Sequence, residues 1–218
     1  MIKLLGICGS PVSGGNTEAL LRASMAHVDA MQDVEAEVVT LGDLSFSGCL
    51  HCNWCVKKQT EGKFCSQEDD LAAVYPKILA ADGIILASPV HFGRLSGTMA
   101  NMVDRLRAFV HGNLYRERLR NKVGGSLAVA FFRGGGVETT LATLNAVFLV
   151  FEMLVATSRL YQIGAAGLSS LGGTGKVTRG VRHMAMEDDF GVASGRMLVD
   201  RVIELARIVR AGQEALGK

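Results

Sequence analysis

Short apolar runs alternate with helix-patterned segments along the whole chain, and this alternation constrains the fold more than any other feature. The runs predict strands at 2–7, 37–41, 83–88, 123–130 and between 154 and 163. The segments between them predict helices over 16–30, through 71–78, from Ser96 to about 106, from about 138, and over roughly 194–211. Five such alternations predict a doubly wound α/β fold, with a five-stranded parallel sheet and helices on both faces.

Length and charge narrow the classes of protein further. The 218 residues fit one domain over 1–218, with a cysteine-rich loop at 47–68. Because 23 basic residues nearly balance 21 acidic ones, we expect no continuous basic face and no nucleic-acid ligand. No signal peptide or membrane span is evident, so we expect a cytoplasmic protein without membrane contact. The glycine-rich segment 164–180 is expected to be a mobile loop.

The loop after the first predicted strand, Gly9 to Thr17, is rich in small and hydroxyl residues. Its backbone N–H groups, its hydroxyls and the following helix end could bind an anion. It lacks the lysine of a nucleoside-triphosphate loop and the G-x-G-x-x-G spacing of dinucleotide folds, so a single phosphate monoester fits better. An ordinary strand-to-helix turn with an Asn or Ser cap explains the loop equally well.

The loops after the third and fourth predicted strands should lie near the first loop, because the carboxyl ends of parallel strands share one edge. The segment 88–97 combines an apolar wall, an aromatic ring and polar backbone groups, which suits a flat heteroaromatic ring. We expect His91 to supply wall or a hydrogen bond rather than to donate a proton. Arg133 and three glycines allow close backbone approach, and Arg133 could offset negative charge on a reduced ring; a flexible turn is the alternative.

Four of the five cysteines lie close together in the sequence, at Cys49, Cys52, Cys55 and Cys65. Three thiolates at three-residue spacing can point at one centre, and a fourth can complete the ligands of a [4Fe-4S] cluster. Zinc and thiols without metal are the alternatives. Cys8, at the end of the first strand, is predicted to be a core residue.

Taken together, these motifs resemble the flavodoxin-like NAD(P)H-dependent FMN reductase and iron-sulfur flavoprotein family. The resemblance rests on Gly-Ser-Pro-x-x-Gly-Gly-Asn-Thr at 9–17, Ser-Pro-Val-His-Phe-Gly at 88–93, Ser96-Gly97, Asp104-Arg105, and Arg-Gly-Gly-Gly at 133–136. Two positions depart from it: Val12 stands where many relatives have a basic residue, and His91 stands where Tyr is usual.

The resemblance implies a site for FMN. Its phosphate would be held by the first loop, through Ser10, Ser13, Gly14, Gly15, Asn16 and Thr17. The isoalloxazine ring would be lined by Pro89, Val90, His91, Phe92 and Gly93, with Ser96 beside them, and its polar edge by Arg133, Gly134, Gly135 and Gly136.

The function expected on this basis is electron transfer through bound FMN, with the flavin and no side chain carrying the chemistry. In one version a cluster takes single electrons from ferredoxin, which Lys57, Lys58 and Lys63 could steer, although a solvated lysine-rich loop explains these residues at least as well. In the other, NAD(P)H reduces the flavin directly; in either, the acceptor is a small molecule. The resemblance also implies a homodimer or homotetramer. The competing hypothesis is a non-catalytic flavodoxin-like module for partner binding or for metal or thiol sensing.

Overall fold

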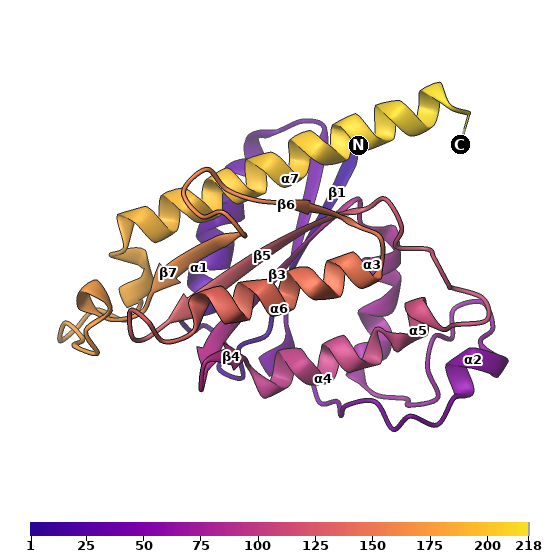
Figure 1. The fold of residues 1–218 in the computed structure, drawn as a ribbon, viewed down its shortest axis with the longest axis horizontal. Coiled ribbons are helices and arrows are strands. Elements are labelled where there is room, and N and C mark those ends of the chain that lie inside the picture. The colour runs from indigo at the N-terminus through magenta and orange to yellow at the C-terminus, as the bar shows by residue number, and fades with distance from the viewer. Residues whose placement is uncertain (218) are drawn as a thin grey trace.

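The computed structural model describes residues 1–217 and contains one twisted sheet with helices on both faces (Figure 1). In chain order the elements are β1 (Ile2–Cys8), α1 (Asn16–Met25), β2 (Val34–Thr40), α2 (Trp54–Lys58), α3 (Tyr75–Ala80), β3 (Gly83–His91), β4 (Arg94–Leu95), α4 (Gly97–Arg105), α5 (Arg107–Val110), β5 (Val123–Ala130), α6 (Val137–Val150), β6 (Leu154–Ala156), β7 (Ala165–Leu168) and α7 (Asp189–Ala215).

The parallel core of the sheet has the strand order β2-β1-β3-β5-β6. The chain runs from β1 to β2, then crosses back past β1 to β3 and continues in the opposite direction to β5 and β6. The direction of winding therefore reverses between β1 and β3. This is the topological switch point at which open α/β sheets bind ligands. The predicted doubly wound fold is confirmed, with β4 and β7 as additional strands.

Alternate residues of the central strands supply the cores on the two faces of the sheet. Leu5 and Ile7 of β1 pack with buried residues of α3, α4 and α6. Leu4 and Cys8 point to the opposite face, where α1 and α7 cover them. This two-residue period follows from the pleat of a β-strand. The buried position of Cys8 confirms its prediction as a core residue, and burial raises the pKa of its thiol to about 11.

The strand predicted between 154 and 163 is only the short β6, and a further strand, β7, lies beyond that range; both pair with β5. β6 pairs with Val123–Gly125, residues 157–164 loop outward, and β7 resumes the pairing with Leu127–Ala130. The Ser126 hydroxyl donates a hydrogen bond of 3.1 Å to the carbonyl of Ile163 and so holds the returning chain. The prediction of a mobile loop over 164–180 is therefore wrong for 165–168, because small, buried residues there pair with the sheet.

Several helix boundaries also differ from the prediction. α1 ends at Met25 and continues as a 3₁₀ turn to Ala30, and its N-cap is Gly15 rather than Asn16 or Thr17. The helix expected through 71–78 is a 3₁₀ turn followed by α3. α7 is longer than predicted at both ends. Its N-terminus is capped by the Asp188 carboxylate, which accepts a hydrogen bond of 3.1 Å from Gly191 N–H. Within residues 1–217, no helix is both long and apolar enough to cross a bilayer.

Candidate functional site

The loop after β1 presents the open N-terminus of α1. No side chain caps this helix at Gly15, so its first N–H groups face outward as donors. The Ser10 hydroxyl is occupied within the loop, where it accepts from Val12 N–H over 3.1 Å. The Ser13 hydroxyl donates to the Asp43 carboxylate, and Thr17 is buried. The predicted anion-binding residues therefore lie together, with several of their polar groups already hydrogen-bonded inside the protein.

Glu18 occupies one of the donors of this loop. Its carboxylate accepts a hydrogen bond of 2.8 Å from Gly14 N–H and one of 2.7 Å from Arg22. Burial alone would raise the pKa of Glu18, but these hydrogen bonds outweigh it and hold the pKa below its usual value. Gly14 N–H is thus committed to a negative charge, and an anion at this loop would bind the remaining donors.

A segment from the far end of the chain covers the same loop. A ring nitrogen of His183 lies 2.8 Å from the carbonyl oxygen of Gly14. Ala185 N–H donates to the Asn16 side-chain oxygen over 2.8 Å. The Arg182 guanidinium lies over Gly14, at 3.3 Å from the position that a β-carbon would take there. Sequence reasoning missed these residues; the signal it had was three basic residues, at 179, 182 and 183, in a glycine-rich segment.

Ser96 connects the loop after β1 with the loop after β3. Its hydroxyl donates to the carbonyl of Gly9 over 2.5 Å and accepts from Met99 N–H over 3.0 Å, which confirms it as the cap of α4. Its own N–H donates to the Ser88 hydroxyl over 3.0 Å. Because Ser96 has no exposed surface, it places the two loops relative to each other rather than presenting its hydroxyl to solvent.

The loop after β3 is a tight hairpin. Val90 and His91 of β3 pair antiparallel with β4, and the two-residue turn between the strands consists of Phe92 and Gly93, both with positive φ. Pro89 and Val90 are half-buried, whereas His91 and Phe92 are exposed. The predicted wall thus consists of the half-buried Pro89 and Val90 and the exposed rings of His91 and Phe92.

The loop after β5 touches this hairpin. A β-carbon added at Gly136 would lie only 2.4 Å from the α-carbon of Gly93, so the two backbones are in direct contact. Arg133 does not point freely into the site: its Nε and Nη2 donate to the carbonyl of Gly172 over 3.3 and 3.2 Å. The structure therefore brings together all three loops that the sequence singled out, at the β1/β3 switch point.

The four clustered cysteines lie at a different place. All four are free thiols and line one small cavity of about 20 Å³. The Ser66 hydroxyl lies 3.3 Å from the Cys52 sulfur and, with a hydrogen bond from Trp54 N–H, lowers the pKa of Cys52. As they stand the thiols do not close around a metal: among residues 1–217, no three His, Cys, Asp or Glu side chains are placed to hold one.

Two arginines border the cysteine cavity. Arg105 is buried and makes hydrogen bonds of 2.7 and 3.1 Å to the Asp69 carboxylate. Burial works to raise the pKa of Asp69, but the Arg105 guanidinium outweighs it, so the pKa lies below its usual value. Arg107 lies on the other side, toward a neighbouring groove. Four thiols and two positively charged side chains therefore border one cavity.

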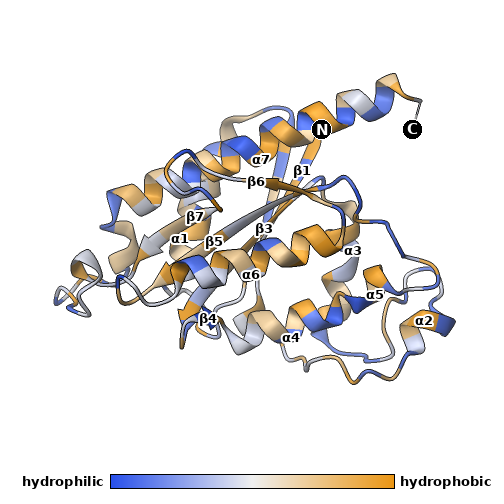
Figure 2. Cartoon of the chain, viewed as in Figure 1, coloured by the Kyte–Doolittle hydropathy of each residue, from blue (hydrophilic) through white to orange (hydrophobic). Residues whose placement is uncertain are grey.

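The groove has a volume of about 630 Å³ and runs between α4, α5 and α6, bordered by Cys49 and His51. It contains no residue of the three converged loops. Val150 at the end of α6 lines it and is largely exposed, and Figure 2 shows the apolar character of this end of α6. The groove is therefore a separate, largely apolar cavity.

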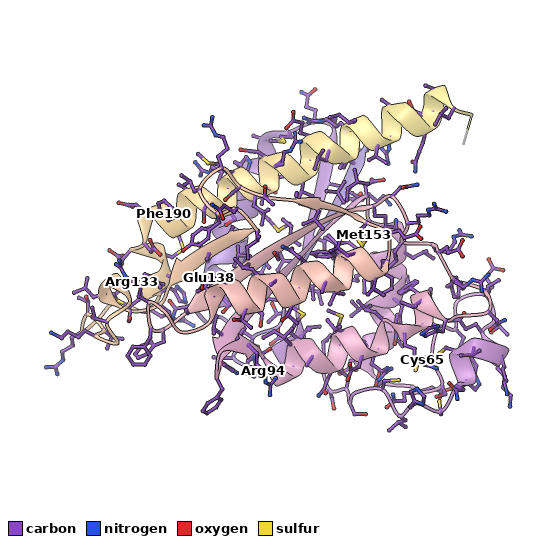
Figure 3. All side chains as sticks on the ribbon, in the orientation of Figure 1. Cys65, Arg94, Arg133, Glu138, Met153 and Phe190 are labelled. Atoms are coloured by element: carbon purple, nitrogen blue, oxygen red, sulfur yellow. The ribbon has the colours of Figure 1, made fainter. Side chains whose placement is uncertain are left out.

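The cysteines and the converged loops are separated within one chain. Figure 3 shows Cys65 at one end of the molecule and Arg133 at the opposite end. The segment 41–53 runs between these ends along α4 (Figure 1).

Known proteins resemble this chain both in sequence and in fold. A family model described as NADPH-dependent FMN reductase matches residues 2–167. An iron-sulfur flavoprotein of Methanocaldococcus jannaschii is 35% identical over 211 residues, covering 96% of this chain and 100% of the relative. One of Archaeoglobus fulgidus is 30% identical over 216 residues, covering 98% and 100%.

Solved structures share the fold. RosB with bound 8-demethyl-8-formylriboflavin-5'-phosphate has a TM-score of 0.73 at 18% identity and covers 97% of this chain and 81% of its own. An NADH:FMN oxidoreductase in its apo form has a TM-score of 0.60 at 18% identity, covering 95% and 90%. With the family model matching most of the chain and the archaeal relatives matching nearly all of it, this chain belongs to the NADPH-dependent FMN reductase family.

Proposed function

We propose that the chain binds FMN at the three converged loops and transfers electrons through it from a reduced donor to a small-molecule acceptor. As a member of this family it is an FMN-dependent oxidoreductase. The observation that carries the proposal is the convergence of the loops after β1, β3 and β5 at the switch point, made by the Ser96–Gly9 hydrogen bond and the Gly93–Gly136 contact.

The phosphate of FMN would bind the loop after β1. The first N–H groups of α1 and the side chains of Asn16 and Thr17 are the donors we assign to it. Ser13 would join them by exchanging its hydrogen bond to Asp43 for one to the phosphate. Arg182 supplies the positive charge that the loop lacks at Val12. The segment 178–186 folds back over this loop and is held there by its hydrogen bonds to Gly14 and Asn16. This position would bring Arg182 to the phosphate.

The ring would lie against Pro89, Val90, His91, Phe92 and Gly93, with the backbone of 133–136 along its polar edge. When bound, FMN supplies the chemistry by accepting and releasing electrons. The chain's own residues bind and orient it, and none is assigned proton transfer. Arg133, tied to the Gly172 carbonyl, fixes the position of the 133–136 loop and adds positive charge near this edge.

Two sources of electrons fit different parts of the molecule. NAD(P)H would deliver hydride directly at the converged loops. Alternatively, Cys49, Cys52, Cys55 and Cys65 would hold a [4Fe-4S] cluster that takes single electrons from ferredoxin, and the exposed Lys57 and Lys58 suit an acidic partner. The second source is supported by the shared cysteine cavity with its two arginines and by the names of the archaeal relatives.

A second copy of the chain completes this proposal. The cysteines and the loops lie at opposite ends of one chain (Figure 3), so a neighbouring subunit would bring one cysteine cavity near another chain's flavin. A homodimer or homotetramer is therefore the assembly we propose.

The phosphate assignment is tested by the double variant Asn16→Ala/Thr17→Ala. We expect it to lose FMN, measured by flavin fluorescence titration, while its circular dichroism stays that of the folded protein. The matched control is Thr143→Ala, which removes an exposed hydroxyl on α6 that bonds only to its own helix. Unchanged FMN affinity in the double variant would contradict the assignment.

The cluster assignment is tested by Cys52→Ala in protein prepared without oxygen. We expect loss of iron and acid-labile sulfide with retention of flavin, whereas the core variant Cys8→Ala should keep both. Equal iron in wild type and Cys52→Ala would remove Cys52 from the ligand set. A wild-type protein that binds neither flavin nor iron would favour the non-catalytic binding module.

A further inference from the structure

Arg107, the first residue of α5, lies between the cysteine cavity and the large groove and lines both. One end of its guanidinium is anchored, because Nη2 donates to the Asn53 side-chain oxygen over 2.6 Å. Asn53 itself sits between Cys52 and Cys55 in a left-handed backbone conformation. The loop that carries the cysteines therefore fixes the Arg107 guanidinium through Asn53.

The Nε atom of Arg107 is buried and has no hydrogen-bond partner among the described residues. A buried guanidinium N–H without an acceptor is unfavourable, because the group has lost its water and gained nothing in return. In contrast, the guanidinium of Arg105 reaches Asp69, Ser47 and Tyr75 through Nε and both of its Nη atoms. Of the two arginines that border the cysteine cavity, Arg107 is therefore the one with a buried N–H that lacks an acceptor.

All four cysteines line the same cavity as Arg107. Burial raises the pKa of the Cys55 thiol, and the strongest influence in the opposite direction is the positive charge of Arg107. A thiolate or an inorganic sulfide at the cavity would accept the Nε hydrogen bond. Hydrogen bonds to cluster sulfurs and nearby charge are two of the factors that set the reduction potential of an iron-sulfur centre.

We propose that Arg107 is a positioning residue for the iron-sulfur centre, donating its Nε hydrogen bond to a sulfur of the cluster and raising the cluster's reduction potential with its charge. This inference rests on the proposed cluster at the four cysteines. Reduction adds one electron from the donor and makes or breaks no bond, so the reduced centre carries one more negative charge. A fixed positive charge beside it stabilises the reduced form more than the oxidised form.

Arg107 also relates the cluster to the groove, since its side chain borders both cavities. Among residues 1–217, no other arginine or lysine lines both of them, and Arg105 borders the cysteine cavity alone. Substituting Arg107 therefore changes the charge next to the cysteines while leaving the buried Arg105–Asp69 ion pair intact.

The test compares wild type, Arg107→Gln, Arg107→Lys and the distant control Arg201→Gln in full-length protein with reconstituted cluster and FMN. Iron, sulfide and flavin are counted per chain, and the cluster potential is measured by titration followed by electron paramagnetic resonance. We expect Arg107→Gln to keep flavin and to make the cluster at least about tenfold harder to reduce, a shift of about 59 mV for one electron. Arg107→Lys should shift less, and Arg201→Gln, whose arginine pairs with Glu204, should not shift.

The other outcomes separate this inference from the function on which it rests. A wild-type protein that forms no cluster would contradict the proposed cluster itself. A wild-type cluster with the same potential in Arg107→Gln would contradict only the role of Arg107. If Arg107→Gln loses iron, retention of iron in Arg107→Lys would support the proposal, and equal loss in both variants would overturn it.

Discussion

The Ser96 hydroxyl donates a hydrogen bond of 2.5 Å to the carbonyl of Gly9, joining two loops that lie 87 residues apart in the chain. The same hydroxyl caps α4 at Met99 N–H, so one buried side chain sets both the start of a helix and the distance between two cofactor loops. Ser96 therefore contributes to the geometry of the site without presenting its hydroxyl to solvent.

Ser96→Ala is therefore expected to lower both stability and FMN affinity. Loss of the cap and of the bond to Gly9 should cost about 1–3 kcal/mol in the free energy of unfolding, measured by urea denaturation. Ser158→Ala is the matched control, because Ser158 is also buried, donates to Gly164 and accepts from Tyr161 N–H. Both variants should lose stability, but only Ser96→Ala should lose FMN affinity; equal affinities would contradict the role of Ser96 at the site.

Gly136→Ala should damage the contact between the hairpin and the loop after β5. Its β-carbon would lie 2.4 Å from Gly93, and the backbone φ there is +106°. Gly134 is the control, since it also has positive φ but nothing lies within 4 Å of an added β-carbon. We expect Gly134→Ala to cost about 1 kcal/mol and Gly136→Ala clearly more, with weaker FMN binding. Similar losses of stability and FMN affinity in the two variants would show that the contact between Gly93 and Gly136 contributes to neither.

Arg182→Gln tests the charge that folds over the first loop. Since the variant keeps a polar side chain but removes the positive charge near Gly14, we expect about tenfold weaker FMN binding, or about 1.4 kcal/mol. Riboflavin, which has no phosphate, should bind wild type and variant equally. The phosphate role of Arg182 would be refuted by an equal loss for FMN and riboflavin.

The fold prediction succeeded where local pattern decides the outcome. The buried strand β3 contains the continuous apolar run 84–87, and the cap at Ser96 follows from a serine placed just before a helix-patterned segment. The break between β6 and β7 was not predictable from pattern, because it depends on long-range pairing of small residues with β5. The fold-back of Arg182 onto Gly14 spans most of the chain, and the basic residues of that glycine-rich segment do not indicate which loop they cover.

The Arg105–Asp69 ion pair gives stability a defined dependence on pH. The folded pKa of Asp69 is lowered, so the pair stabilises the protein above the unfolded aspartate value of about 3.9 and is lost as the pH falls through the folded pKa. Asp69→Asn should cost about 3 kcal/mol at pH 7, because it leaves a buried guanidinium without its counter-charge. The difference from wild type should shrink below about pH 4. A gap that stays constant down to pH 3 would show that Asp69 does not titrate as the pair requires.

The most direct test of the central claim is the absorption spectrum of the protein purified without oxygen, together with identification of the flavin released on denaturation. The account predicts flavin bands with released FMN, lying on a broad absorbance that bleaches when the cluster is reduced. Flavin bands alone would keep the FMN-dependent function and remove the cluster. A colourless protein that also fails to bind added FMN would contradict the account.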